Sequence, residues 1–355
     1  MDSSPSPDTN GTMAQIWNTT ESTSTNESGD AFNSTVPVST SDPYHISYGE
    51  LVFASIILLI ILVIGIIGNS MIIWSVILSR KLQTSTNAFV VNLSVADLLT
   101  CLFLPWYIAA FLGQKGWPLP EAKWLCGLAG FTIFACIGTS LYTLAAIAVN
   151  QSIMTCSFRY NAIYKPWATG VMIALTWFIP GGALSIFLLA GIGGFGYERV
   201  SYPSCSDLDD IASGATFNVA QTIGGFPIPL VTIVVSYVWI YVYLRRHLNK
   251  DELKITKTLF VVVCSFIGCF LPFFIANAFP NTGHLVFYLV LPTFANSAIN
   301  FVIYATLHPQ FKIVLGCIYR CHYAAIPEPS RVLKVILGQN QHPITSRNQA
   351  VELNI

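Results

Sequence analysis

The hydrophobic residues of this chain are grouped into seven long, nearly uninterrupted stretches. Each holds roughly 20 to 30 residues, enough to cross the hydrocarbon layer of a bilayer as an α-helix. The stretches are continuously apolar rather than alternating, which favours membrane helices over the strands of a β-barrel. They cover Leu51–Leu78, Ala88–Leu112, Trp124–Cys156, Thr169–Leu189, Phe217–Leu244, Thr256–Phe279 and Leu285–Thr306.

The composition supports the same interpretation. Of the 355 residues, 10% are charged and 54% are hydrophobic, whereas soluble domains carry about 25% charged residues. The net charge is zero, so it says nothing about partners. We therefore expect an all-α membrane protein that folds as a seven-transmembrane helix bundle.

Lys and Arg residues are distributed unevenly between the predicted loops. The first 48 residues contain none, and most of the 17 lie in the first, third and fifth loops and after the last stretch. Cytoplasmic loops carry the excess of basic residues in membrane proteins. The pattern predicts a multi-pass plasma-membrane protein with an extracellular N-terminus and a cytoplasmic C-terminus.

The two ends of the chain are expected to lie outside the bundle. Residues 1–48 are rich in Ser, Thr and Asn, which predicts a disordered extracellular tail. We expect residues 49–321 to form the transmembrane domain and residues 322–355 a cytoplasmic tail. The N-terminal tail contains four N-glycosylation sequons, at Asn10, Asn18, Asn26 and Asn33.

The nine cysteines divide by position. Cys126 and Cys205 lie at predicted external positions, where disulfide bonds form, and we expect them to be paired. Cys317 and Cys321 lie on a short segment from Pro309 whose apolar pattern predicts an amphipathic eighth helix on the membrane surface, so they are candidate lipidation sites. Four others are interpreted as small buried residues: Cys101, Cys136, Cys264 and Cys269.

One charged side chain, Asp97, lies deep inside a stretch. A charge in hydrocarbon is costly and marks a functional site by default. Asp97 is about 15 Å along its helix, near the middle of the membrane. Polar side chains at similar depths on other stretches are Asn69, Ser140, Asn296, Ser297 and Asn300.

Two interpretations of this polar cluster remain open from the residues alone. Carboxylate, amide and hydroxyl oxygens are the ligands that small hard cations prefer, so the cluster could bind a cation together with water. The alternative is a hydrogen-bonded network that packs the helices, with Asp97 protonated. A proton relay is disfavoured because the seven stretches contain no other Asp, Glu or His.

Landmark residues occur in every stretch and in order. They are Gly68-Asn69, Asn92 to Leu99, Cys126, Trp177, Pro229 with Tyr237, Cys269 to Pro272, and Asn300 to Tyr304 with Phe311. From about Gly49 to Cys321, the chain resembles the rhodopsin-like (class A) G-protein-coupled receptors. This resemblance implies a receptor, not an enzyme, that binds an extracellular ligand and signals to a heterotrimeric G protein.

The resemblance also implies an allosteric metal site. In that family the matching aspartate and its neighbours form a sodium pocket that favours the inactive state, and no other cofactor is expected. The residues at these positions here are Asp97, Ser140, Asn296, Ser297 and Asn300. The resemblance supports the Cys126–Cys205 disulfide as well.

The family's ligand pocket opens between the external halves of the third, fifth, sixth and seventh helices. The residues at these positions are mostly apolar, and no acidic residue or lysine stands where a cationic amine or retinal would be held. We expect a neutral or weakly polar small molecule, with a peptide as the alternative. The positions are Ile133, Phe134, Ile137, Gln221, Thr222, Phe270, Phe273, Phe274, Asn277, Val290 and Phe294.

The chain departs from the family at two positions that control coupling. Asn150-Gln151-Ser152 replaces the usual Asp/Glu-Arg-Tyr, and Phe301 replaces the proline of Asn-Pro-x-x-Tyr. Gln151 has no charge with which to restrain the sixth helix or contact a G protein, and Glu252 has no arginine opposite it. Raised basal activity and weak coupling are both compatible with this change. A non-coupling receptor, acting as a decoy, scavenger or dimer partner, remains an alternative.

Other features of the inner side are expected to serve coupling or the membrane. The resemblance directs Tyr237 and Tyr304 toward the inner cavity. The basic residues between the fifth and sixth stretches would face anionic lipid or the G protein. A transporter or channel is disfavoured because the sequence shows no internal repeat and one buried carboxylate. Nothing in the sequence suggests nucleic-acid binding.

Overall fold

The fold was derived from a computed structural model. The predicted glycosylation sites Asn10, Asn18, Asn26 and Asn33, and the pocket residues Gln221 and Thr222, lie outside the part of the chain that it describes. For Glu252 it describes the backbone alone. The described residues are 46–113, 116–156, 160–191, 193–198, 202–207, 225, 227–244, 250–277, 279 and 282–338.

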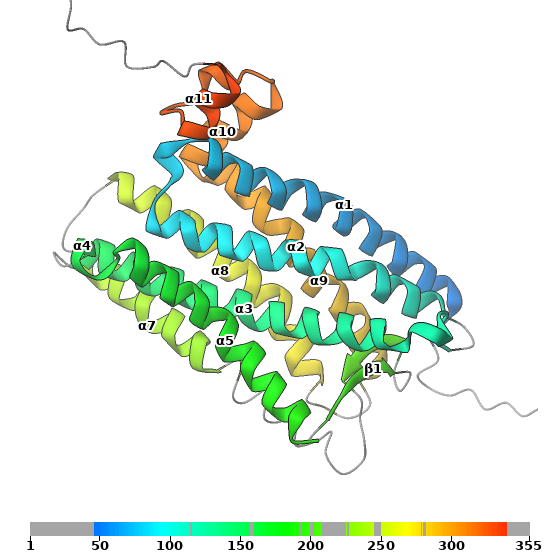
Figure 1. Ribbon diagram of the computed structural model, residues 1–355. Helices are drawn as coiled ribbons and strands as arrows, with labels where there is room; N and C mark the ends of the chain where they lie inside the picture. Colours follow the sequence, from blue (N-terminus) through cyan, green and yellow to red (C-terminus); the bar gives the residue numbers. More distant parts are fainter. Residues whose placement is uncertain are drawn as a thin grey trace, which may run out of the picture. The chain divides into compact units, whose positions relative to one another are not determined.

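Seven long helices follow one another in these ranges, where the hydrophobic pattern predicts them (Figure 1). Six are long and apolar enough to cross a membrane, and the seventh is a shorter apolar helix, Pro227–Tyr243 in its apolar part. This confirms the predicted helical bundle. The helices are α1 (Tyr48–Leu78), α2 (Ser85–Leu112), α3 (Lys123–Cys156), α5 (Pro166–Leu189), α7 (Pro227–Leu244), α8 (Lys250–Asn277) and α9 (Gly283–Leu307).

Side-chain caps set where two of the membrane helices begin. The Ser47 hydroxyl accepts from the Glu50 backbone N–H, and the Glu50 carboxylate accepts from the Ser47 backbone N–H at 2.7 Å. This capping box satisfies backbone donors that have no partner in the first turn of α1. Thr84 caps α2 in the same manner, accepting from the Asn87 backbone N–H at 3.2 Å.

The buried apolar side chains form two clusters. One lies toward the end of the bundle that carries the disulfide, here called the disulfide end, and includes Phe111, Phe287 and Phe294. The other lies toward the opposite end, here called the α10 end, and includes Phe266 and Tyr304.

Two glycines allow α1 to approach its neighbours closely. A Cβ atom on Gly65 would lie 2.4 Å from the Cys101 sulfur of α2, and one on Gly68 would lie 2.4 Å from the Phe301 ring of α9. Small residues permit this kind of close packing between membrane helices. Phe301, which replaces the family's proline, therefore fills space that Gly68 leaves open.

Large apolar side chains cover the outward faces of the bundle, as hydrocarbon requires; examples are Phe53, Phe178 and Trp239. The cysteines divide between this surface and the interior. Cys101 and Cys136 are buried as predicted, and Cys269 is half-buried. The prediction for Cys264 is wrong, because this residue is exposed on α8. Periodicity was too weak to distinguish its outward face from an inward one.

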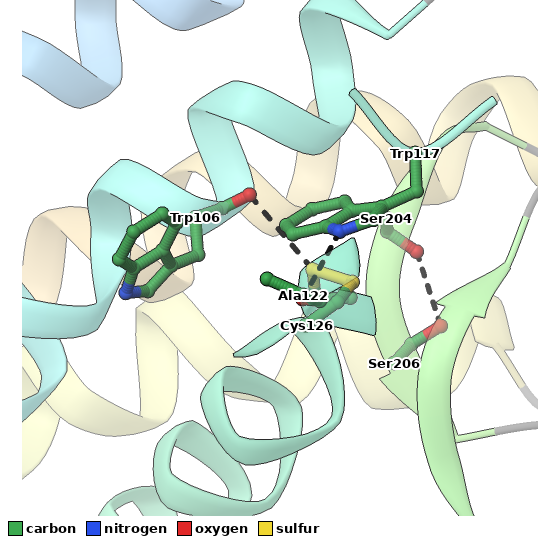
Figure 2. Close-up of a disulfide and its surroundings, with 7 residues drawn as sticks. Trp106, Trp117, Ala122, Cys126, Ser204 and Ser206 are labelled. Carbon is green, nitrogen blue, oxygen red and sulfur yellow. Dashed lines mark hydrogen bonds between the residues drawn. A yellow bond between two sulfur atoms is a disulfide. The ribbon is translucent and has the colours of Figure 1, made fainter. Parts of the chain in front are cut away.

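A two-stranded sheet lies next to the disulfide end. Strand β1 (Phe195–Glu198) runs antiparallel to β2 (Ser204–Asp207), and Tyr197 is opposite Cys205. Cys205 forms the predicted disulfide with Cys126, which confirms that pairing. Figure 2 shows this bond, which joins α3 to β2, beside Trp106 of α2, whose carbonyl oxygen lies 3.8 Å from Cys205 Sγ. The disulfide therefore attaches the sheet to the start of α3.

The chain continues as folded structure after the seventh long helix. Helix α10 (Pro309–Tyr319) confirms the predicted eighth helix and buries Phe311 and Val314 while Ile313 stays exposed. Beyond it lie a 3₁₀ turn, Tyr323–Ala325, and a short helix α11 (Arg331–Ile336). Figure 1 shows α10 and α11 together at one end of the helices.

Candidate functional site

Asp97 is buried in the middle of the bundle, with 2% of its surface exposed. The Asn300 side-chain amide of α9 donates a hydrogen bond to Asp97 Oδ2 at 2.8 Å. The Ser297 hydroxyl, one turn earlier on α9, also hydrogen-bonds to the carboxyl group. The carboxyl group therefore joins α2 to α9 inside the bundle.

A small cavity lies against this carboxyl group. Its volume is about 10 Å³, close to the smallest that holds one water molecule. It is therefore suited to a water molecule or a small ion rather than to an organic ligand. The side chains around it are Asp97, Thr100, Ile137, Ser140, Phe266, Phe270, Thr293, Phe294, Asn296 and Ser297.

Several oxygen atoms near this layer are buried without a hydrogen-bond donor in the described part of the chain. They are the amide oxygens of Asn69, Asn296 and Asn300. The Asn69 amide nitrogen is used elsewhere, since it donates to the backbone oxygens of Gly65 and Ser297 at 2.9 and 2.8 Å. Unpaired buried acceptors are costly. Of these three residues Asn296 lines the cavity, so a cation or a water molecule there would supply the partner that its oxygen lacks.

The structure brings the predicted ion-site residues together. Asp97, Ser140, Asn296 and Ser297 line the cavity, and Asn300 bonds to Asp97. Sequence reasoning missed three further lining residues, Thr100, Phe266 and Thr293. Each is three or four positions from a predicted site residue on the same helix, so helical spacing could have found them.

Three of the predicted ligand residues lie beside the same cavity. Ile137, Phe270 and Phe294 form its apolar wall. Ile137 packs against both apolar clusters. The Phe270 ring stacks on Phe266 with ring centres 4.3 Å apart. The candidate ion site and the candidate ligand site therefore share side chains.

The remaining described pocket residues lie closer to the disulfide end. Ile133 and Val290 are buried in the cluster there, with Phe273 packed against it. Phe274 stacks on Phe270 with ring centres 6.4 Å apart. Asn277 is exposed at the last residue of α8, so it is not gathered with the others.

Aromatic residues of the sheet region cover this end of the helices, which no pattern in the sequence predicted. Phe195 of β1 contacts the rings of Phe131 and Phe134 of α3, with centres 5.9 and 5.4 Å apart. Tyr202 packs edge-on against Phe111 and Phe287. The predicted pocket residue Phe134 is thus in contact with β1 rather than open to an unobstructed entrance.

Asn150 and Gln151, which stand where the family usually has an acidic residue and an arginine, differ in their surroundings. Thr86 of α2 donates to the Asn150 side-chain oxygen at 2.7 Å, and the Asn150 amide donates to the Tyr160 hydroxyl of α4 (Tyr160–Ile163) at 3.4 Å. Gln151 is fully buried, and its amide has no partner in the described part of the chain. Asn150 therefore links three helices, a role that sequence reasoning missed.

The two tyrosines predicted to act at the inner cavity are both at the α10 end. Tyr304 is buried and packs against Phe311 of α10, with ring centres 5.7 Å apart. Tyr237 packs edge-on against Phe260 of α8. Neither hydroxyl has a hydrogen-bond partner among the described residues.

The junction of α9 and α10 contains a buried histidine. His308 is 2% exposed, and its Nδ1 accepts from the Phe311 backbone N–H at 3.4 Å, which caps α10. Burial lowers the pKa of His308 from 6.5 to about 4. Farther along, Cys317 is half-buried and Cys321 is exposed. Both lipidation sites stay predictions.

Residues 68–306 match the family described as 7 transmembrane receptor (rhodopsin family). A somatostatin receptor type 5 from Rattus norvegicus is 28% identical over 320 residues, which are 83% of each chain. A melatonin receptor type 1C from Xenopus laevis is 27% identical over 73% of this chain and 65% of its own length. This chain therefore spans about two thirds of that relative.

The solved structure of squid rhodopsin has a similar fold. The TM-score is 0.65 at 20% sequence identity, over 84% of this chain and 94% of the rhodopsin chain. The likeness concerns the arrangement of the helices.

Proposed function

Because this chain belongs to the rhodopsin family of seven-transmembrane receptors, a family of receptors rather than enzymes, we propose that it is a plasma-membrane receptor for an extracellular ligand that signals to a heterotrimeric G protein. The unequal distribution of Lys and Arg supports an extracellular disulfide end and a cytoplasmic α10 end. The sequon-bearing residues 1–48 would then be outside the cell, and the tail after α10 inside.

The observation that carries this proposal is the sharing of one small cavity by the ion-site and ligand-site residues. A sodium ion beside Asp97 requires the cavity to keep its present size. A ligand that moves Phe270, Phe294 or Ile137 changes the wall of that cavity. Sodium and ligand would each stabilise a different state of the bundle, so each lowers the affinity of the other.

The side chains of the predicted ligand pocket favour an uncharged small molecule. Ile133, Val290 and Phe294 are buried apolar residues that provide no partner for a ligand's charge. The relatives named for melatonin and somatostatin represent the two alternatives, a neutral indole and a peptide. Melatonin and other neutral indoles are therefore the first probes, and somatostatin is the second.

The test measures nucleotide exchange on co-expressed G proteins in membranes that contain the receptor. We expect a neutral indole to stimulate exchange, and sodium chloride to raise the concentration needed. Phe270→Ala should reduce the response at least tenfold, whereas Phe178→Ala, which alters an outward side chain that is 74% exposed, should leave it unchanged. Absence of exchange with every G-protein class and both probe types, at confirmed surface expression, would count against the proposal.

A second candidate function is a receptor that binds its ligand without coupling. The buried, unpartnered amide of Gln151 favours it, because the residue is neutral and enclosed where a coupling arginine is usual in the family. Gln151→Arg separates the two candidates. If this variant couples and the natural chain binds ligand silently, the non-coupling function is correct.

A further inference from the structure

The chain beyond α10 returns to the turn between α1 and α2. We call residues 322–338 the return segment. The Ser330 backbone N–H donates to the Leu78 oxygen at 2.9 Å, and the Arg80 backbone N–H donates to the Glu328 oxygen at 2.8 Å. The Ser79 hydroxyl donates to the Pro327 oxygen at 2.7 Å. These bonds fix the start of α11 at the last turn of a membrane-spanning helix.

Two apolar side chains bury the return segment against the bundle. Ile326 is 3% exposed and Leu333 is fully buried, and both belong to the cluster at the α10 end. Ser330 caps α11 by accepting from the Leu333 backbone N–H at 3.2 Å. The segment is therefore a folded part of the molecule with a defined orientation.

The short helix α11 has three distinct faces. Successive residues of an α-helix are about 100° apart, which groups Val332, Val335 and Ile336 on one side. These three side chains are 45%, 58% and 54% exposed. Leu333 faces the bundle, about a quarter turn away, and Lys334 lies opposite the apolar side. An exposed apolar face opposite a basic residue is the pattern of a helix at a membrane surface.

The position of α11 agrees with that pattern. Its cap residue bonds to Leu78, the last residue of α1. The outward apolar side chains of α1 continue to Trp74 and Ile77, which are 40% and 37% exposed. The helix therefore begins at the level where the lipid-facing surface of the bundle ends.

The charge of this region indicates the kind of membrane. Residues 309–338 contain a single acidic residue, Glu328. They contain four basic residues, Lys312, Arg320, Arg331 and Lys334. Basic residues beside an amphipathic helix attract anionic headgroups near the surface.

We propose that the return segment is a second membrane-surface element next to α10. The apolar face of α11 enters the headgroup region of an anionic bilayer, while Arg331, at the flank of that face, lies among the phosphates and Lys334 points away from the bilayer. The orientation of the chain given under the proposed function determines only which leaflet of the bilayer α11 enters. The contact itself does not depend on a ligand or on a G protein.

The test uses the full chain in nanodiscs of phosphatidylcholine with or without phosphatidylserine. A photoreactive benzoylphenylalanine replaces Val335 in one variant and the neighbouring Lys334 in a matched control. Illumination followed by mass spectrometry measures lipid attached at each position. We expect several-fold more lipid adduct from position 335 than from position 334, and more at position 335 when phosphatidylserine is present.

Both positions are exposed, so neither substitution disturbs the buried contacts of Leu333. Equal adduct from the two positions, or attachment of position 335 to protein instead of lipid, would overturn the proposal. Because no signalling is measured, this result is independent of whether the receptor couples. A silent receptor that still gives the expected adduct contradicts the proposed function alone.

Discussion

At the residue scale, the buried acceptors around Asp97 determine what the centre of the bundle can bind. The carboxyl group receives hydrogen bonds from Asn300 and Ser297, while neighbouring amide oxygens have no donor in the described part of the chain. Such a group of oxygens attracts a donor or a cation. The cavity is too small for anything larger than a water molecule or a small ion.

Asp97→Asn should remove the response of the receptor to sodium. Sodium that binds the folded but not the unfolded state stabilises the folded state by about 1.4 kcal/mol when its concentration is ten times Kd. We expect the Tm of the natural chain to be higher in sodium chloride than in choline chloride, and the Tm of the variant to be the same in both. An equal sodium effect in the two proteins would contradict a site at Asp97.

Gly68→Ala should destabilise the bundle through one neighbour. The added methyl group would lie 2.4 Å from the Phe301 ring, and overpacking of this kind costs about 1–3 kcal/mol. Phe301→Leu in the same chain should recover part of the lost Tm. The control is Gly170→Ala, where no atom lies within 4 Å of the added group. If the Tm of the double variant falls by the sum of the falls in the two single variants, the contact between positions 68 and 301 does not cause the loss of stability.

His308 should make stability depend on pH. Folding lowers the pKa of this residue from 6.5 to about 4, so the folded state favours the neutral form. This contribution is complete above pH 6.5 and is lost as the pH falls toward 4. His308→Asn keeps a capping acceptor but does not titrate. Between pH 7 and pH 5, the Tm should fall less for the variant; equal falls would exclude His308 as the cause.

At the element scale, glycines on α3 control the approach of the β1–β2 sheet. A Cβ atom on Gly127 would lie 2.7 Å from the Phe195 backbone oxygen, and one on Gly130 would lie 3.0 Å from the Cys205 oxygen. Backbone atoms cannot rotate away as a side chain can. The sheet therefore packs against α3 only because both positions lack a side chain.

Gly127→Ala should displace β1 while leaving the helices in place. Hydrogen exchange at the amides of Phe195 to Glu198 should become faster, because the sheet loses its contact with α3. Gly268→Ala, which meets no atom within 4 Å, should leave exchange in β1 unchanged. Slow exchange in both variants would show that the close approach at Gly127 is not what holds the sheet in place.

The helices were predictable from sequence, and the shorter elements were not. Long apolar stretches have few alternatives in a membrane. By contrast, β1 and β2 have four residues each, and β1 is half-buried throughout, so no alternation marks it. The fold of the return segment depends on Ile326 and Leu333. The segment has other apolar residues as well, and nothing in their spacing distinguishes these two until the chain brings them to α1.

The candidate site was predictable only where polar residues stand out against an apolar background. Asp97 and the asparagines of α9 do so. Thr100 and Thr293 do not, because threonine is common in membrane helices. Their hydroxyls donate to their own helix backbones, to Ala96 and Val290. Apolar residues that contact a ligand have the same pattern as core residues, so the structure was needed to place them beside the cavity.

At the scale of the whole molecule, the Asp97 layer lies between the two apolar clusters. Ile137 packs against both of them. A ligand that moves side chains near the disulfide end would therefore affect the α10 end through the side chains that surround the cavity. The proposed exchange between sodium and ligand would follow from this single shared layer.

The return segment should be part of the smallest stable chain. A chain that ends at Cys321 loses the partners of Leu78 and Arg80 together with the buried Leu333, so its Tm should fall. A chain that ends at Gly338 keeps all of these contacts and should match the full chain. Equal Tm values for all three would show that the segment adds nothing to stability.

The same contacts impose an order on biosynthesis. The turn after α1 leaves the ribosome early, yet the oxygen that accepts from the Ser79 hydroxyl belongs to a residue translated 248 positions later. All seven membrane helices are therefore made before this turn can be completed. A ribosome that terminates early would release an inserted protein whose α10 end is unfinished, and the exposed polar groups of that turn would mark it for quality control.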